Sequence, residues 1–515
     1  MTKIMLAQPF VEAKGSLGII KPPTGIQYLG AVLKSLGYNV LLVHDSVDNI
    51  VAATEDYNPD YVGLSCMSNS FPEAETVAER INAPTILGGW HASGSVDSYV
   101  GGVETETLDE ILDTFDFVVR GEGEVALPKL LEALKARQTP VDISGIGFKE
   151  NGKIKLNPKQ AERLDLNQIP TPLWTGLNAG VYLDLRTGKL DLSVHFNRGC
   201  RYRCSFCETA GAYEGRVRRP DAKKAVDYIE SILRIYQPDA VTFTDEDLFS
   251  NIRWVREVVS EIKGRNIPET YKVSFDTFAT INDLRKLDQD QALLEQMAES
   301  GFFSFTIGVE SLNPETIHEY NKEFMVVGLM NTEEKRTYRI LSPQDKQRML
   351  VDVYQREIQK GVNLAYKHGI LCCGDYIVGN PRESSDKVKE GFERFKQIDD
   401  LVIAYVPIYT PFPGTGLWKI DYDSGKIIRK PDGRIDWSRF DASQGALELD
   451  YDVQQLRGDL EVDFYTSARF QRDMSVMLKD KPGMLPFFEG RFKFMAERNP
   501  DDSDIKNIQE RLRKY

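Results

Sequence analysis

The stretch FNRGCRYRCSFC, residues 196–207, holds three of the six cysteines of this chain. Cys200, Cys204 and Cys207 follow a short strand-like run and a glycine. Thiolates at this density bind a soft metal ion or an iron–sulfur cluster. The number of thiols in this loop therefore decides which kind of metal site the sequence predicts. The kind of metal site in turn indicates the fold around it.

Structural zinc requires four closed ligands, often as two C-x-x-C pairs. Only one such pair occurs here, and His195 and Glu208 are the nearest other candidate ligands. Three ligands leave one coordination position open, as in a catalytic site. A [4Fe–4S] cluster normally has four thiolates, so a cluster held by Cys200, Cys204 and Cys207 has one iron free to bind a substrate or cofactor. Zinc and three unligated thiols are the alternatives.

Outward from this loop, residues 191–415 alternate strand-like and amphipathic helical segments. The strand candidates are LDLSVHF, AVTFTD, YKVSFDT, FFSFTIGVE, LCCGDYIVG and VIAYVPIY. Six such units predict a TIM-like (β/α)6 barrel, complete or partial, with its chemistry at the carboxyl ends of the strands. Residues 416–515 lose this alternation and predict a small, mainly helical C-terminal region.

Residues 1–140 show an earlier alternation, with strands at KIMLAQ, NVLLVHD, YVGLSCM, TILGG and FDFVVRG. Alternation of this kind predicts an α/β domain with a doubly wound, Rossmann-like parallel sheet that binds ligands outside the carboxyl ends of its strands. Residues 141–190 predict a linker that contains a hairpin with its turn near Asn151 and Gly152.

The composition limits the class of protein. The chain has 515 residues and a formal net charge of −14, which predicts several domains and disfavours nucleic acid as a partner. No apolar run reaches the ~20 residues of a membrane span. The first residues lack the apolar core of a signal peptide. Because half of the cysteines cluster, a disulfide framework is disfavoured and a reducing cytoplasm is expected.

The segment CRYRCSFC resembles the C-x-x-x-C-x-aromatic-C signature of the radical S-adenosylmethionine (SAM) superfamily, at the family's position after the first barrel strand. The resemblance implies that SAM chelates the fourth iron through its amino and carboxylate groups. Electron transfer from the reduced cluster then breaks the S–C5′ bond and yields a 5′-deoxyadenosyl radical. Phe206 is implied to pack near the adenine, and a flavodoxin or ferredoxin is expected as electron donor.

Two further segments are predicted to bind SAM. FTDEDLFSN resembles the family's acidic segment, in which Asp245 and Glu246 would bind the ammonium group of SAM. An acidic loop or a helix N-cap is the alternative for these two residues. Ser274 and Asp276, assigned to the fourth strand, are predicted to reach the ribose hydroxyls.

The later part of the barrel continues the resemblance. FTIGVES resembles the family's fifth-strand segment, where Gly308 allows close approach and Glu310 lies near SAM. YTPFPGTGLW resembles a segment typical of cobalamin-linked members. The connection 322–369 is unusually long, and it is either a lid or substrate contact or a benign surface insertion. Cys372 and Cys373 are predicted to pack in the core, and a hydrogen donor or auxiliary ligand is the alternative.

The N-terminal segments GLSCMSNS, ILGGWHASG and DFVVRGEGE resemble the cobalamin-binding domain that precedes the barrel in a large subfamily. The residues implied to line the slot for the nucleotide tail are Ser65, Gly88, Gly89, His91, Gly121 and Glu122. A capped turn is the alternative role for His91. QPFVEAKG stands where other cobalamin proteins have D-x-H-x-x-G, so no histidine of that loop is expected to coordinate cobalt. Some members have lost the cofactor, and a nicotinamide site at residues 121–126 is a further alternative.

These features predict a radical SAM enzyme with a cobalamin domain, a [4Fe–4S] cluster, SAM and cobalamin. Methyl transfer to a small molecule, lipid or peptide is the first choice. The alternatives are a cyclase or oxidoreductase like the anaerobic porphyrin cyclases, a tRNA methylthiotransferase, or a non-enzymatic cofactor sensor. No single catalytic residue is assigned, because the cofactors carry out the difficult chemistry.

Overall fold

The computed structural model describes residues 2–10, 20–104, 106–160, 163–184, 188–213, 215–480, 485–498 and 503–513. The chain forms two compact units. The first comprises Met1–Val181, His195–Ile229 and Thr410–Leu447, and the second comprises Tyr182–Val194, Glu230–Tyr409 and Glu448–Tyr515. The cysteine loop therefore belongs to the first unit, although the strand before it belongs to the second. The domain boundaries expected from the sequence stay predictions.

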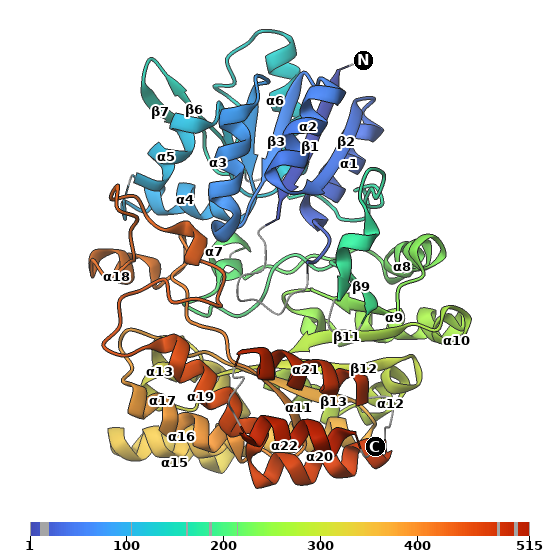
Figure 1. The fold of residues 1–515 in the computed structure, drawn as a ribbon, viewed down its shortest axis with the longest axis vertical. Coiled ribbons are helices and arrows are strands. Elements are labelled where there is room, and N and C mark those ends of the chain that lie inside the picture. The colour runs from blue at the N-terminus through green and yellow to red at the C-terminus, as the bar shows by residue number, and fades with distance from the viewer. Residues whose placement is uncertain are drawn as a thin grey trace. The chain divides into compact units, whose positions relative to one another are not determined.

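The first unit is built on a seven-stranded sheet in the order β2-β1-β3-β4-β5-β6-β7 (Figure 1). Its strands are β1 (Lys3–Pro9), β2 (Asn39–Asp45), β3 (Tyr61–Ser65), β4 (Thr85–Gly88), β5 (Phe117–Val119), β6 (Ile146–Glu150) and β7 (Lys153–Leu156). β1 to β5 are parallel, which confirms the doubly wound sheet. β6 and β7 form the predicted hairpin and extend the sheet, with β6 antiparallel to β5 and β7 antiparallel to β6.

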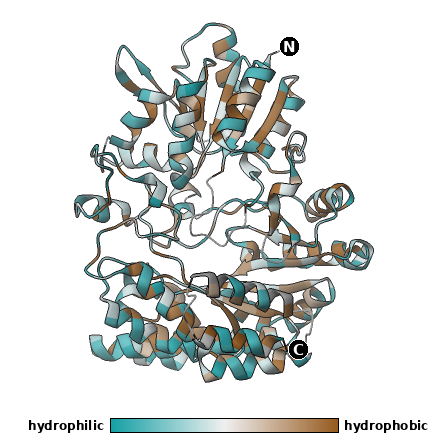
Figure 2. Ribbon diagram, in the orientation of Figure 1, coloured by the Kyte–Doolittle hydropathy of each residue, from teal (hydrophilic) through white to brown (hydrophobic). Residues whose placement is uncertain are grey.

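Helices cover both faces of this sheet. They are α1 (Thr24–Ser35), α2 (Val47–Tyr57), α3 (Phe71–Arg80), α4 (Trp90–Val100), α5 (Glu106–Thr114) and α6 (Gly123–Lys135), and the short turn η1 (Ser68–Ser70) precedes α3. Later segments of the first unit form α7 (Glu208–Tyr213), α18 (Trp418–Asp423) and the short turn η4 (Trp437–Arg439). α1 contacts α6, and α2 contacts α3. The parallel strands between them are largely apolar, as Figure 2 shows. Most of their side chains are buried, because both faces of the sheet are covered.

The second unit contains a sheet in the order β14-β13-β12-β11-β10-β9-β8. Its strands are β8 (Leu183–Asp184), β9 (Lys189–Val194), β10 (Ala240–Phe243), β11 (Ser274–Ala279), β12 (Phe302–Glu310), β13 (Leu371–Tyr376) and β14 (Leu401–Tyr405). β9 to β14 are parallel and adjacent in chain order, which confirms a partial (β/α)6 barrel. β11 is the third of these strands, so the assignment of Ser274 and Asp276 to a fourth strand is wrong.

The helices of the second unit alternate with its strands. They are α8 (Ala222–Tyr236, shared with the first unit), α9 (Ile252–Gly264), α10 (Ile267–Tyr271), α11 (Ile281–Asp288), α12 (Gln291–Glu299), α13 (Pro314–Glu319), α14 (Glu323–Leu329), α15 (Thr332–Ile340), α16 (Pro343–Lys367) and α17 (Ser385–Lys396), with the turn η3 (Leu248–Ser250). The long connection 322–369 is therefore helical, and it forms α14 to α16.

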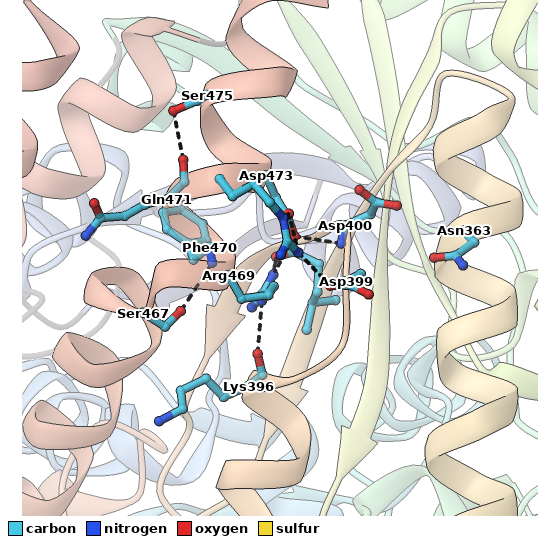
Figure 3. A network of polar contacts seen from close by, with 12 residues as sticks. Asn363, Lys396, Asp399, Asp400, Ser467, Arg469, Phe470, Gln471, Asp473 and Ser475 are labelled. Atoms are coloured by element: carbon cyan, nitrogen blue, oxygen red, sulfur yellow. Dashed lines mark hydrogen bonds and ion pairs between the residues drawn. The ribbon is translucent and has the colours of Figure 1, made fainter.

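The C-terminal residues of the second unit are helical, as predicted, in α19 (Val453–Thr466), α20 (Ala468–Asp480), α21 (Leu485–Arg498) and α22 (Ser503–Leu512). Arg469 of α20 donates to the carbonyls of Lys396 and Leu401, each at 2.9 Å (Figure 3). Asp473 accepts from the amide of Asp400 at 3.0 Å. These contacts anchor α20 on the segment between α17 and β14. Within the described parts of the chain, no helix has both the length and the apolar character that crossing a membrane requires.

Candidate functional site

The three cysteines lie on a loop of the first unit whose two ends are joined by backbone hydrogen bonds. Arg198 and Arg218 exchange two of them, at 2.9 and 3.1 Å, and so close the loop. Gly199 has φ +101°, and its Cα lies so close to the backbone of Arg216 that no side chain fits there. The amide of Cys207 donates to the Cys204 carbonyl at 3.2 Å, in a turn that leads into α7.

All six cysteines are among the described residues, and none forms a disulfide. Cys200, Cys204 and Cys207 keep partly exposed side chains, whereas the other three cysteines are buried. Three accessible thiols on one closed loop fit the donor set that a three-thiolate iron–sulfur cluster needs. Within the described ranges, no three metal-binding side chains converge as a single ion requires, and a four-iron cube is much wider than one ion.

The two alternative ligands near this loop have different surroundings. Burial raises the pKa of Glu208 to about 8, because the carboxylate is removed from water. The carbonyl of His195 accepts a hydrogen bond from the Tyr28 hydroxyl at 2.8 Å.

Two ion pairs fix the cysteine loop to the start of α6. Arg198 Nη2 lies 2.5 Å from Glu124 Oε1, and both side chains are buried. Arg218 forms an ion pair with Glu122, the residue before α6. The pKa of Glu124 is lowered, because attraction by Arg198 outweighs the opposing effect of burial. The predicted cobalamin residue Glu122 is thus bound by an arginine of the cysteine loop.

The predicted cobalamin slot lies at the carboxyl ends of β3 and β4. Gly89 has φ +100°, and a Cβ there would lie 2.9 Å from the Cys66 amide nitrogen, so only glycine fits. Gly88 and Gly121, by contrast, face open space. Ser65 is the partly exposed last residue of β3. Small residues that face open space at the ligand-binding edge of a doubly wound sheet fit a bulky cofactor. The loop in which a cobalt-binding histidine is predicted to be absent lies largely in residues 11–19, outside the described residues.

His91 has no solvent-accessible surface. Its ring lies between Phe71 and Trp437, with centroids 4.3 and 4.6 Å away, and its Nδ1 is 3.1 Å from Ser68 Oγ. Burial lowers the pKa of His91 to about 3, so the imidazole is neutral. A structural role accounts for these contacts. The neighbouring Trp90 instead contacts Tyr213 of α7 edge to face.

In the second unit, Glu310 ends β12 with φ +67°, a left-handed conformation that is uncommon outside glycine. Its Oε1 lies 3.1 Å from Lys322 Nζ, which also donates to the Gly308 carbonyl at 2.8 Å. A Cβ at Gly308 would lie 2.5 Å from Glu310 Oε1, so glycine leaves room for this carboxylate. Asp375 of β13 is paired in register with Gly308. Burial raises the pKa of Asp375 well above its ordinary value, Glu310 raises it further, and Lys322 opposes both.

The other residues of the second unit predicted to bind SAM lie at different levels of the same sheet, whereas Phe206 lies in the cysteine loop of the first unit. Asp245 is buried and Glu246 is partly exposed in the loop after β10. Asp276 accepts a hydrogen bond from Thr242 at 3.0 Å. Ser274 is the first residue of β11, so it lies at the amino end of the strand and not with Glu310 at the carboxyl edge.

Cys372 and Cys373 are buried in β13. Burial raises the pKa of Cys372. Cys373 pairs with Thr306, two residues before Gly308 and Asp375, and so lies on the same face of the sheet as Asp375. Burial of both thiols favours the core-packing interpretation for the pair.

Several residues that build the site were missed by the sequence interpretation. Arg198 and Arg218 border the cysteine loop, and Lys322 opens the long connection. Glu124 was expected only on the rim of the cobalamin slot, as part of the GEGE turn (residues 121–124), and not as a partner of Arg198. Charged residues next to glycines and cysteines were the available signal, but the sequence does not show which charges pair.

Comparisons with known proteins identify the families that the two main parts of the chain match. The model of the B12 binding domain matches residues 14–131, and that of the radical SAM superfamily matches residues 194–395. An uncharacterized methyltransferase of Pyrococcus horikoshii is 23% identical over 93% of this chain and 94% of its own length. The anaerobic magnesium-protoporphyrin IX monomethyl ester cyclase of Rubrivivax gelatinosus is 23% identical over 77% of this chain and 66% of its own.

One solved structure extends the likeness to the whole fold. The cobalamin-dependent SAM radical enzyme OxsB, with aqua-cobalamin and SAM bound, matches 100% of this chain and 75% of its own with a TM-score of 0.64. The sequence identity is 15%, so this similarity concerns the fold alone.

Proposed function

Because the chain belongs to the radical SAM superfamily and carries a B12-binding domain ahead of its radical SAM domain, we propose that it is a cobalamin-dependent radical SAM methyltransferase. The observation that carries this proposal is the direct contact between the cysteine loop and the GEGE turn of the B12-binding domain, through Arg198 and Glu124. Methyl transfer needs both cofactors in a fixed arrangement, and this contact supplies a fixed arrangement of the segments that would hold them.

Each proposed cofactor has residues suited to it. Cys200, Cys204 and Cys207 would hold the [4Fe–4S] cluster, and the residues proposed for SAM are Phe206, Asp245, Glu246, Asp276, Gly308 and Glu310. Gly88, Gly89 and Gly121, with Ser65, would admit the nucleotide tail of cobalamin. The cluster supplies the electron that cleaves SAM, and cobalamin supplies a carrier for the methyl group. The protein orients these groups and excludes water from them.

The full-length similarity to a methyltransferase favours methyl transfer over cyclisation, because the cyclase matches a smaller part of the chain. The methyl acceptor is proposed to be a small molecule, a lipid or a peptide. A flavodoxin or ferredoxin is proposed as electron donor, in the cytoplasm.

The test is anaerobic purification with iron and cobalt analysis, followed by incubation with dithionite and SAM that carries a labelled methyl group. We expect 5′-deoxyadenosine and label on the bound cobalamin. Cys204→Ala should lose iron and both products, whereas Cys372→Ala, a buried cysteine outside the loop, should keep iron. Cleavage without label on cobalamin would favour the cyclase alternative, and an intact cluster with bound SAM but no cleavage would favour a sensor.

A further inference from the structure

The cysteine loop and the predicted cobalamin slot are both attached to one short turn, residues 120–124. On one side of this turn, Glu122 pairs with Arg218 and Glu124 pairs with Arg198, so both carboxylates bind the two ends of the cysteine loop. Arg198 also approaches Glu122, with Nη1 3.7 Å from Oε2. The arginines are themselves joined by the backbone bridge that closes the loop.

On its other side, the same turn is bound to α4. Arg120 forms an ion pair with Asp97, and the amide of Gly121 donates to Ser93 Oγ at 2.9 Å. α4 begins directly after Gly89, the glycine that admits no side chain. The slot is therefore continuous in the chain with α4, and polar contacts join α4 to the turn and the turn to the cysteine loop.

The Arg198–Glu124 pair is placed so that it resists displacement. The exposed fractions of the two side chains are 9% and 6%, so removing either partner breaks a short, buried ion pair and leaves the other charge with weaker, more distant partners. The guanidinium group of Arg198 also lies over the ring of Tyr28, 5.1 Å from its centroid, and the Tyr28 hydroxyl donates to the His195 carbonyl. A planar guanidinium held by a carboxylate and a ring has one orientation, which a lysine cannot reproduce.

We propose that Arg198 is a positioning residue that sets the separation of the cluster from cobalamin by holding the cysteine loop on the 120–124 turn. The inference rests on the proposed function, because it assumes that the loop holds a cluster and the slot holds cobalamin. Arg198 acts through Glu124 and touches neither cofactor in this proposal. Its effect is therefore on the geometry between the two cofactors and not on their binding.

Pulsed electron paramagnetic resonance tests this on the full-length holoenzyme. The reduced cluster and cob(II)alamin are both paramagnetic, so the coupling between them reports their separation directly. In Arg198→Met and Arg198→Lys we expect the distance distribution to shift or broaden by about 1 Å, the scale at which a misplaced group costs roughly 100-fold in rate. Glu124→Gln, which keeps the shape of the side chain, should give the same change. Iron and cobalamin content should stay at the wild-type level.

Arg216→Met is the matched control, because Arg216 is an exposed arginine of the same loop. Its distance distribution should equal that of the wild type. An unchanged distribution in Arg198→Met and Glu124→Gln, with both cofactors bound, would overturn this inference and leave the proposed function standing. A wild-type protein that binds neither iron nor cobalamin would instead overturn the proposed function, and with it this inference.

Discussion

Lys322→Met is expected to destabilise the end of β12 by about 3–5 kcal/mol, because it removes one partner of a buried ion pair. Lys322 Nζ lies 3.1 Å from Glu310 Oε1, and the side chains are only 5% and 15% exposed. Loss of the ammonium leaves Glu310 beside the buried carboxyl of Asp375, and it removes the charge that opposes the rise in the pKa of Asp375. Glu310 is also proposed to lie near SAM, so the affinity for SAM should fall together with stability.

Lys360→Met is the matched control, because it breaks a lysine–glutamate pair of similar length in the same long connection. Lys360 Nζ is 2.8 Å from Glu357, but its side chain is 63% exposed. Exposed pairs contribute at most about 1 kcal/mol, so this change should be nearly silent. The comparison separates the effect of burial from the effect of losing a lysine.

Hydrogen exchange of peptides that cover β12 measures the opening free energy locally, which matters because the chain has two units that need not unfold together. Equilibrium dialysis of SAM measures the affinity. The double variant Glu310→Gln/Lys322→Met should recover stability relative to Lys322→Met, with a coupling energy of about 2 kcal/mol. The reasoning fails if Lys322→Met costs no more than Lys360→Met, or if the two substitutions in the double variant are simply additive.

Three further changes have defined outcomes. Gly89→Ala forces a side chain into φ +100° against the backbone of Cys66, so it should lower the free energy of unfolding by about 1–3 kcal/mol. Gly88 faces open space, so Gly88→Ala should keep the stability of the wild type and lose cobalamin. Thermal melting and cobalt analysis of the two variants check both outcomes. Trp437→Ala removes a fully buried ring and should cost about 3–5 kcal/mol in denaturant unfolding of the first unit; a cost below that of an exposed substitution would contradict the packing. Burial and Glu110 raise the pKa of Glu75 to about 7 in the folded protein, so the folded state holds this proton more tightly than the unfolded state does. The contribution of Glu75 to stability should therefore fall as pH rises from about 4.5 to about 7. In Glu75→Gln this part of the dependence of the melting temperature on pH should disappear.

The strands and the cysteine loop were predictable because their signals are local. Apolar runs such as residues 3–8 and 61–67 specify buried parallel strands by composition alone, and the spacing of Cys200, Cys204 and Cys207 identifies the loop within eight residues. The glycine pair after β4 was also found, since glycines at a strand end have a clear steric meaning.

The remaining features depend on partners far apart in the chain. Arg198 pairs with Glu124, which lies 74 residues earlier in the chain. The ring of His91 packs against Trp437, which comes from the C-terminal part of the chain. His91 was predicted either to touch cobalamin or to be a capped turn residue, and nothing in the sequence indicated its aromatic contact with Trp437. A single sequence carries no signal for such pairs, so the site's supporting residues were not identified.

The strained conformation of Glu310 gives the long connection a structural role at the end of β12, beside the roles expected from the sequence. A non-glycine residue at φ +67° persists only where its surroundings fix it. Lys322, at the start of the connection, binds the Glu310 carboxylate and the Gly308 carbonyl. Tyr354, within α16, donates to the carbonyls of Gly308 and Val309 at 3.2 and 3.1 Å. The connection therefore needs enough length for α16 to return to the end of β12. Its buried side chains Lys322 and Tyr354 hold the end of β12 in the backbone conformation that Glu310 adopts.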